Sequence, residues 1–210
     1  MGNIIKSVKF EEIYGEFYSE GDAKSLVVIF PGLKYGHDKP LLYYARKAAQ
    51  MSGKDVLCLN YDKKLDWDDI GKEIIGVVAD ECYNIIGNCM KRNYECIYFL
   101  SKSIGTEVSG RTAEKLGASK VKFFYLTPTY TAIKYIEKFK GLVIAGTKDS
   151  IFENKYIEEV KKINGSKLML IEGGNHSLEV KEEVIHDIDV LKAVVNKYID
   201  FFEEEQNGEV

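Results

Sequence analysis

From residue 25 onward, two kinds of segment alternate along the chain, and this alternation restricts the possible folds more than any other feature. Short runs rich in apolar, β-branched and aromatic residues have the length of buried strands, and the amphipathic runs between them have helical periodicity. Such a pattern is typical of a parallel sheet covered by helices on both faces. The predicted strands are 25–30, 55–61, 95–100, 120–126, 142–146 and 167–171, and the predicted helices are 39–51, 66–91, 104–116, 131–139, 152–163 and 178–204.

The first 18 residues follow a different pattern. Two short alternating segments, 4–10 and 12–18, are separated by little more than Glu11 and predict an antiparallel pair of strands. With 210 residues and 45% hydrophobic content, the chain is long enough for one large core. We therefore expect a single α/β domain over residues 1–210, a three-layer α/β/α sandwich whose twisted, mostly parallel sheet has an antiparallel N-terminal edge.

Charge and composition argue against several kinds of partner. The chain has 29 Lys and Arg against 33 Asp and Glu, a net charge of −4, with no basic stripe for nucleic acid. No stretch approaches the roughly 18 apolar residues of a membrane span, and residues 1–7 lack the apolar core of a signal peptide. We expect a cytoplasmic protein that binds neither nucleic acid nor membrane, and the oligomeric state stays open.

The cysteines indicate neither a metal site nor a disulfide framework. Cys58, Cys82, Cys89 and Cys96 show no C-x-x-C spacing, and in a cytosolic chain buried free thiols are the favoured interpretation. Neither a metal nor a cofactor is expected.

A serine-containing turn follows the predicted strand 95–100. The segment 101–105 (SKSIG) leads into a helix, and Gly105 allows the chain to turn sharply. This arrangement would hold Ser103 in a strained backbone geometry with its hydroxyl at the end of the sheet. The N–H groups at the helix start would favour negative charge nearby.

A serine hydroxyl needs a base to remove its proton, and the base works best when a carboxylate orients it. The chain has three histidines. His176 lies in a glycine-containing loop after the last predicted strand, and Asp149 lies in the loop directly after strand 142–146. Because loops at the carboxyl ends of parallel strands meet at one edge of a sheet, we predict that Ser103, Asp149 and His176 form a catalytic triad.

The other two histidines receive different predictions. His37 follows the first parallel strand at the same edge as Ser103, where it could contact a substrate. His186 falls within the last predicted helix, where a surface or packing role is expected. The predicted apolar face of that helix consists of Val184, Ile188, Leu191, Val195 and Ile199.

The turn, the acid and the base together resemble the α/β-hydrolase superfamily over about residues 20–205. Its nucleophile elbow has the pattern G-x-S-x-G, with Ser101 here in the place of the first glycine, and its triad follows the order serine, acid, histidine. Segments 30–32 and 36–38, followed directly by a helix, are similar to compact serine hydrolases near the dienelactone hydrolase and carboxylesterase groups. The nucleophile of the dienelactone hydrolase group would be a cysteine, whereas the residue at this position here is Ser103. The resemblance implies an α/β-hydrolase fold with a minimal lid or none.

The resemblance also implies an oxyanion hole, in which backbone N–H groups stabilise the negative oxygen of the intermediate. One donor would be Ile104, the residue after the nucleophile. The other would be Leu33, in the glycine-containing turn after strand 25–30.

A short segment between predicted strand 120–126 and the helix ending at 139 implies an open substrate pocket. Thr127 and Tyr130 are expected on its acyl side, and Lys34, Tyr35 and His37 are expected opposite.

The implied activity is hydrolysis of an ester or thioester of a small-molecule acyl substrate through an acyl-enzyme intermediate. A peptidase, an amidase or an acyltransferase could use the same triad, because pocket shape and water access decide among them. A non-catalytic binding module on the same fold is a further alternative, against which the presence of all three triad residue types argues.

Overall fold

The computed structural model describes residues 4–10, 13–19, 21–61, 72–90, 93–117, 121–180 and 184–203. The strands in these stretches are β1 (Ile4–Phe10), β2 (Ile13–Tyr18), β3 (Ser25–Phe30), β4 (Asp55–Asn60), β5 (Cys96–Ser103), β6 (Val121–Pro128), β7 (Gly141–Gly146) and β8 (Ser166–Ile171). The helices are α1 (Pro40–Met51), α2 (Lys72–Cys89), α3 (Gly105–Leu116), the short 3₁₀ turn η2 (Tyr130–Ala132), α4 (Ile133–Phe139), α5 (Asn154–Lys161) and α6 (Val184–Glu203). Part of the second predicted helix, 66–71, lies outside the described residues.

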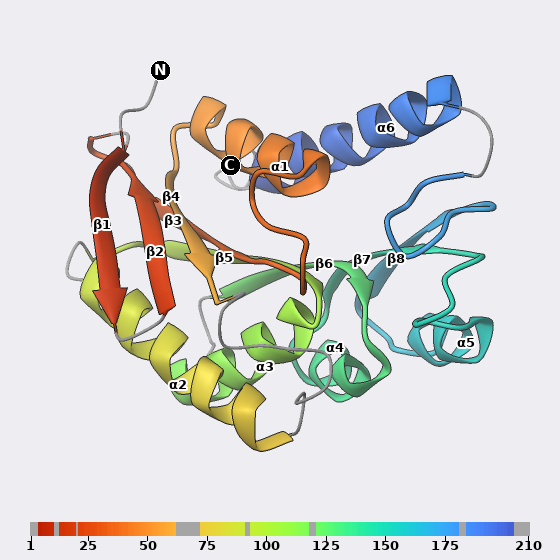
Figure 1. Cartoon of the computed structure of the whole chain (residues 1–210), viewed down its shortest axis with the longest axis horizontal. Helices are drawn as coiled ribbons and strands as arrows, with labels where there is room; N and C mark the ends of the chain where they lie inside the picture. Colours follow the sequence, from red (N-terminus) through yellow and green to blue (C-terminus); the bar gives the residue numbers. More distant parts are fainter. Residues whose placement is uncertain are drawn as a thin grey trace.

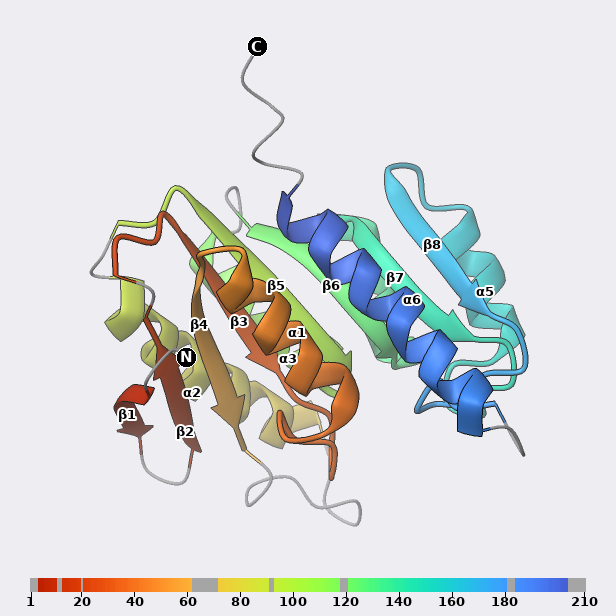
Figure 2. The same ribbon diagram turned by 90° about the horizontal axis from the view of Figure 1, so that it is seen from above.

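The described strands form one eight-stranded sheet in the order β1-β2-β4-β3-β5-β6-β7-β8. Strands β3 to β8 pair in parallel, whereas β2 pairs antiparallel with both β1 and β4. The prediction of a mostly parallel sheet with an antiparallel N-terminal edge is confirmed. Helices α1 and α6 cover one face, and α2, α3, α4 and α5 cover the other, which gives the three layers visible in Figures 1 and 2.

Burial on both faces explains why the central strands are apolar without interruption. Successive side chains of a strand point to opposite faces of the sheet, and all six residues of β3 are buried. Val28 and Phe30 belong to the core on the side of α2 and α3. Val27 and Ile29 belong to the core on the side of α1 and α6.

The last helix begins later than predicted. Helix α6 starts at Val184 rather than at residue 178. The side-chain oxygen of Asn175 accepts the backbone N–H groups of Ser177 and Glu179, and Leu178 has a φ of 63°. Such local side-chain bonds offer the backbone an alternative to helix, so this segment forms turns.

The predicted apolar face of α6 was wrong in part, because Leu191 and Val195 pack against the core but the other three residues are exposed. Val184 and Ile188 are 74% and 55% exposed, and His186 is exposed in the first turn. The buried face consists of Val190, Val194, Tyr198, Phe201 and Phe202. Its rings pack against Tyr98 and Phe124 of the sheet. Aromatic side chains bury more area than Val or Ile, so the face that carries them turns inward.

The four cysteines are buried and free, as expected. None of the described helices is long and apolar enough to cross a membrane.

Candidate active site

The turn that carries Ser103 is sharp and closely packed. Strand β5 runs through Ser103, three residues beyond its predicted end, and α3 begins at Gly105. Ser103 has a φ of 52°, in the left-handed region that residues other than glycine rarely adopt. A Cβ on Gly105 would stand 2.5 Å from the carbonyl oxygens of Phe30 and Pro31. Only glycine fits there, so the strained turn depends on this residue.

Ser101 occupies the position of the first glycine in the elbow pattern. It is fully buried, and its hydroxyl donates to the carbonyl oxygen of Phe124 on β6 at 3.4 Å. The neighbouring strand thus satisfies the extra hydroxyl, and the turn remains at Ser103.

The structure brings the three predicted triad residues together. His176 Nε2 lies 2.8 Å from Ser103 Oγ, and His176 Nδ1 lies 2.7 Å from Asp149 Oδ2. The three residues follow or end β5, β7 and β8, so the parallel sheet places them at one edge. With Nδ1–H donating to the carboxylate, Nε2 is free to accept the serine proton.

Asp149 is held as an anion in a nearly buried position. Burial would raise the pKa of its carboxyl group, but the hydrogen bond and the charge of His176 outweigh it. The backbone N–H groups of Phe152 and Ile151 also donate to Oδ1, at 3.0 and 2.8 Å. Together these donors hold the pKa of Asp149 below its usual value.

The loops that carry the acid and the base contact each other through their backbones. The N–H of Lys148 donates to the carbonyl of Gly174 at 2.9 Å, and the N–H of Gly173 donates to the hydroxyl of Thr147 at 2.9 Å. A Cβ on Gly146 would collide with the backbone of Gly174. The two loops therefore approach as closely as they do only because Gly146 lacks a side chain.

The predicted oxyanion-hole residues flank Ser103. Gly32 and Tyr35 close a tight turn through two backbone hydrogen bonds of 3.2 and 3.1 Å, with Leu33 inside it. A Cβ on Gly32 would stand 3.1 Å from the Ser103 Cβ, so this turn lies against the nucleophile. Among the described residues, the N–H groups of Leu33 and Ile104 donate no backbone hydrogen bond that would occupy them.

The residues predicted to contact substrate are dispersed. Lys34 is exposed in the Gly32–Tyr35 turn, with a φ of 55°. The hydroxyl of Tyr35 accepts the N–H of Leu41 at 3.3 Å, and its own pKa is raised by burial to about 12. His37 Nε2 lies 3.3 Å from a carboxylate oxygen of Glu16 on β2. His37 is therefore engaged with the antiparallel edge.

The two residues predicted on the acyl side, Thr127 and Tyr130, differ in their exposure to solvent. Tyr130 is 57% exposed and stacks on Tyr156 of α5 at a ring separation of 5.6 Å. Thr127 is fully buried with a φ of 38°. A fully buried side chain does not line an open pocket, so Thr127 lies behind the site. After β6, the described chain enters η2 and α4 directly, with Thr129 as the linking residue.

Lys102 is a residue of the site to which the sequence analysis assigned no role. It is 1% exposed, and Nζ donates to the hydroxyl of Thr127 at 2.7 Å and to the carbonyl of His176 at 2.8 Å. Burial lowers its pKa to about 8, against opposing effects of the Asp149 and Glu179 charges. The sequence offered no signal for this residue, because the predicted strand ended at residue 100 and Lys102 fell in the turn after it.

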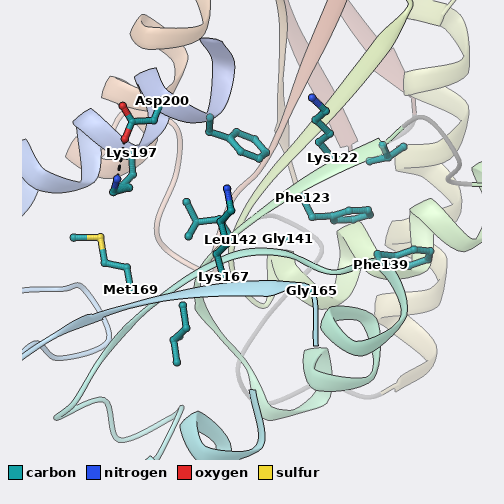
Figure 3. Close-up of a pocket in the computed structure, with 13 residues that line it drawn as sticks. Lys122, Phe123, Phe139, Gly141, Leu142, Gly165, Lys167, Met169, Lys197 and Asp200 are labelled. Atoms are coloured by element: carbon teal, nitrogen blue, oxygen red, sulfur yellow. Dashed lines mark hydrogen bonds and ion pairs between the residues drawn. The ribbon is translucent and has the colours of Figure 1, made fainter. Parts of the chain in front are cut away.

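A cavity of about 460 Å³ lies at the other end of the strands from Ser103. Figure 3 shows its lining at the amino ends of β6, β7 and β8, with Lys197 and Asp200 of α6 on one side. Ser103, Asp149 and His176 do not line it. In the described stretches, no group of three or more His, Cys, Asp and Glu side chains is placed to hold a metal ion.

Comparisons with known proteins reveal the fold but no close relative. No protein-family model and no curated protein matches the sequence. Among solved structures, Est1E from Butyrivibrio proteoclasticus with bound ferulic acid has a TM-score of 0.72 at 12% identity, with 95% of this chain and 98% of that chain covered. Dienelactone hydrolase from Anabaena variabilis has a TM-score of 0.71 at 15% identity, with 97% of each chain covered.

An esterase from Pyrococcus furiosus has a TM-score of 0.70 at 12% identity, with 95% of this chain and 92% of that chain covered. Each of these likenesses spans nearly the whole of both chains. The chain therefore has the α/β-hydrolase fold.

Proposed function

We propose that this protein is a serine hydrolase that cleaves the ester or thioester bond of a small acyl substrate. The observation that carries the proposal is the continuous chain of hydrogen bonds from Asp149 through His176 to Ser103, at 2.7 and 2.8 Å. These distances are within the reach that a general base needs to take a proton from its nucleophile.

In the first half of the reaction, Ser103 Oγ attacks the carbonyl carbon while His176 Nε2 accepts its proton. The N–H groups of Ile104 and Leu33 stabilise the resulting oxyanion, each typically by about 3 kcal/mol. His176 then donates the proton to the departing alcohol or thiol, which leaves the acyl group on Ser103. Asp149, an anion at neutral pH because its pKa is lowered, stabilises the histidine while it is charged.

In the second half, water takes the place of the alcohol or thiol. His176 removes a proton from water, and the hydroxide attacks the acyl-enzyme carbonyl. Ser103 leaves with the proton returned by His176, and the free acid departs. The amino end of α3, directly after the nucleophile, favours negative charge in both halves.

The similar structures favour an ester substrate over an amide. Est1E, which binds ferulic acid, the Pyrococcus furiosus esterase and the dienelactone hydrolase all share the fold.

A fluorophosphonate probe tests the nucleophile. The wild-type protein is expected to be labelled and Ser103→Ala is expected to remain unlabelled. Ser109→Ala is the matched control, because Ser109 is a buried serine of α3 whose hydroxyl donates to the carbonyl of Thr106 at 3.1 Å. It should label like the wild type. An unlabelled wild type would contradict the proposal.

A panel of p-nitrophenyl esters and thioesters of increasing acyl length tests the bond. Hydrolysis of any member that Ser103→Ala does not hydrolyse supports the proposal. Labelling by the probe together with inactivity toward the whole panel would instead point to a peptidase, an amidase or an acyltransferase.

A further inference from the structure

Lys102 is buried where a lysine weakens the fold. Its side chain is among the largest that are fully buried, at 1% exposure. In the described part of the chain, no carboxylate lies within ion-pair distance of its ammonium. Burying an ammonium without a paired carboxylate costs folding free energy. Stability therefore does not explain this residue, and its contacts must.

The ammonium of Lys102 connects three loops at the carboxyl edge of the sheet. From β5, Nζ reaches the hydroxyl of Thr127 at the end of β6 and the carbonyl of His176 after β8, at 2.7 and 2.8 Å. It also lies 4.6 Å from the centre of the Tyr35 ring, in the loop after β3. A cation over an aromatic face is attracted to the ring.

Two of these contacts lie next to the reacting groups. The carbonyl that Lys102 binds belongs to His176 itself, whose ring nitrogen is 2.8 Å from Ser103 Oγ. Thr127 lies where the pairing of β5 with β6 shifts, between the pairs Lys102–Leu126 and Ser103–Pro128. One ammonium thus restrains both the backbone of the base and the backbone beside the nucleophile.

The loop of the base needs such a restraint. It contains Gly173 and Gly174, which allow the backbone many conformations, and a shift of the base by about 1 Å can cost about 10²-fold in rate. Lys102 does not contact a substrate, because it is buried behind the site.

We propose that Lys102 is a positioning residue, whose ammonium holds the backbone of His176 so that the imidazole stays within hydrogen-bond reach of Ser103. This inference rests on the proposed hydrolase function. Lys102 then affects the rate of the chemical steps and does not affect substrate binding.

The test compares Lys102→Met with Lys54→Met. Lys54 is a matched control, because it is also buried, at 6% exposure, and lies 4.9 Å from the Tyr98 ring at the other edge of the sheet. In Lys102→Met we expect kcat to fall by 10- to 100-fold, KM to stay within about 2-fold, and the fluorophosphonate labelling rate to fall with kcat. In Lys54→Met we expect kcat within about 2-fold of wild type.

Thermal unfolding separates positioning from folding. Replacing a buried charge by an apolar group is often neutral or stabilising, so Lys102→Met should lose activity without a lower melting temperature. A kcat within 2-fold of wild type would overturn the inference, and so would a loss of activity that only follows the loss of folded protein.

A second pair of variants leaves the lysine in place and covers the case in which Lys102→Met does not fold. Thr127→Ala removes one acceptor of the ammonium, and Thr127→Ser keeps it. We expect kcat 3- to 10-fold lower in the alanine variant and within about 2-fold in the serine variant. Equal values for the two would overturn the inference. An unlabelled wild type would overturn the proposed function and this inference together, whereas a labelled wild type with unaffected variants would overturn this inference alone.

Discussion

A lysine is buried beside a tyrosine ring at each end of the parallel strands, which we call the carboxyl edge and the amino edge of the sheet. Only the lysine at the carboxyl edge contacts a residue of the candidate active site. At the carboxyl edge, Lys102 lies 4.6 Å from the Tyr35 ring and bonds the loop of His176. At the amino edge, Lys54 lies 4.9 Å from the Tyr98 ring.

The difference teaches that the cavity of about 460 Å³ and the hydrogen-bonded group of Ser103, His176 and Asp149 lie at opposite ends of the strands. In a parallel sheet with helical crossovers, the amino ends of helices follow the carboxyl ends of strands. That edge therefore gathers the N–H groups and loops that orient polar side chains. The cavity lies at the amino edge, and Ser103, Asp149 and His176 do not line it.

The strongest test of the contrast between the two edges is to remove the proposed nucleophile, Ser103. Ser103→Ala should lower kcat by about 10⁶-fold, because Oγ forms the bond to the acyl group. Initial rates at high enzyme concentration measure the residual activity. A variant that keeps more than a hundredth of wild-type activity would move the chemistry away from this edge.

Asp149→Asn should have the next largest effect. The amide cannot stabilise the charged histidine and disfavours its working tautomer, so kcat should fall by about 10⁴-fold. The measurement is kcat/KM on the best ester of the panel, with circular dichroism to show that the fold is intact. A loss of less than 10-fold would show that the carboxylate only supports the loop.

The pH dependence of stability tests whether Lys102 is buried as a cation. Burial lowers the pKa of Lys102 from 10.5 to about 8. Below pH 8, the ammonium is charged in both states and folding carries the full cost of burying it. Between pH 8 and 10.5 the unfolded chain binds the additional proton, so stability rises with pH, by about 3 kcal/mol over the whole interval.

Urea unfolding of the wild type and of Lys102→Met from pH 7 to 9.5 measures this slope. We expect the wild type to gain stability relative to the methionine variant as the pH rises. A constant difference across the interval would mean that the lysine is not buried as a cation.

Gly105→Ala tests the packing of the elbow. The added Cβ would meet two carbonyl oxygens at 2.5 Å, and crowding of this kind costs roughly 1–3 kcal/mol. Gly87→Ala is the control, because Gly87 lies exposed in α2 with open space around it, and alanine there should stabilise the helix by up to about 1 kcal/mol. Urea unfolding of both variants gives the comparison, and a neutral Gly105→Ala would show that the turn can relax.

The smallest effect is expected at the amino edge. Lys197 pairs with Asp200 at 2.8 Å beside the cavity, and both side chains are exposed. Such pairs contribute about 0–1 kcal/mol, so Lys197→Met should change the melting temperature little and leave kcat within about 2-fold. A marked loss of activity would connect the two edges and remove the contrast between them.

The sequence was sufficient to predict the sheet and the proximity of Ser103, Asp149 and His176, whereas their role as a catalytic triad stays a prediction. Unbroken apolar runs identify strands buried on both faces, and residues directly after such strands, such as Asp149 and His176, meet at one edge by a general rule of parallel sheets. The turn at Ser103 was recognisable because its glycine and its place between strand and helix are local properties.

Other features depend on packing between distant segments, and periodicity does not report them. Helix α6 has two apolar stripes, and the contacts of its aromatic rings with Tyr98 and Phe124 show which one faces the sheet. The positive φ of Thr127 and the burial of Lys102 arise where β5 and β6 lose register. A threonine and a lysine in a strand end are ordinarily polar surface residues, so the sequence offered no reason to place them inside.

The contact between Gly146 and Gly174 constrains how descendants of this protein can diverge. Because the acid and base loops meet backbone to backbone there, the distance between Asp149 and His176 depends on Gly146, a residue that carries no functional group. A side chain on Gly146 would collide with the backbone of Gly174 and force the loops apart. In lineages that keep the acid and the base, Gly146 is therefore expected to persist as strictly as the two residues whose spacing it sets.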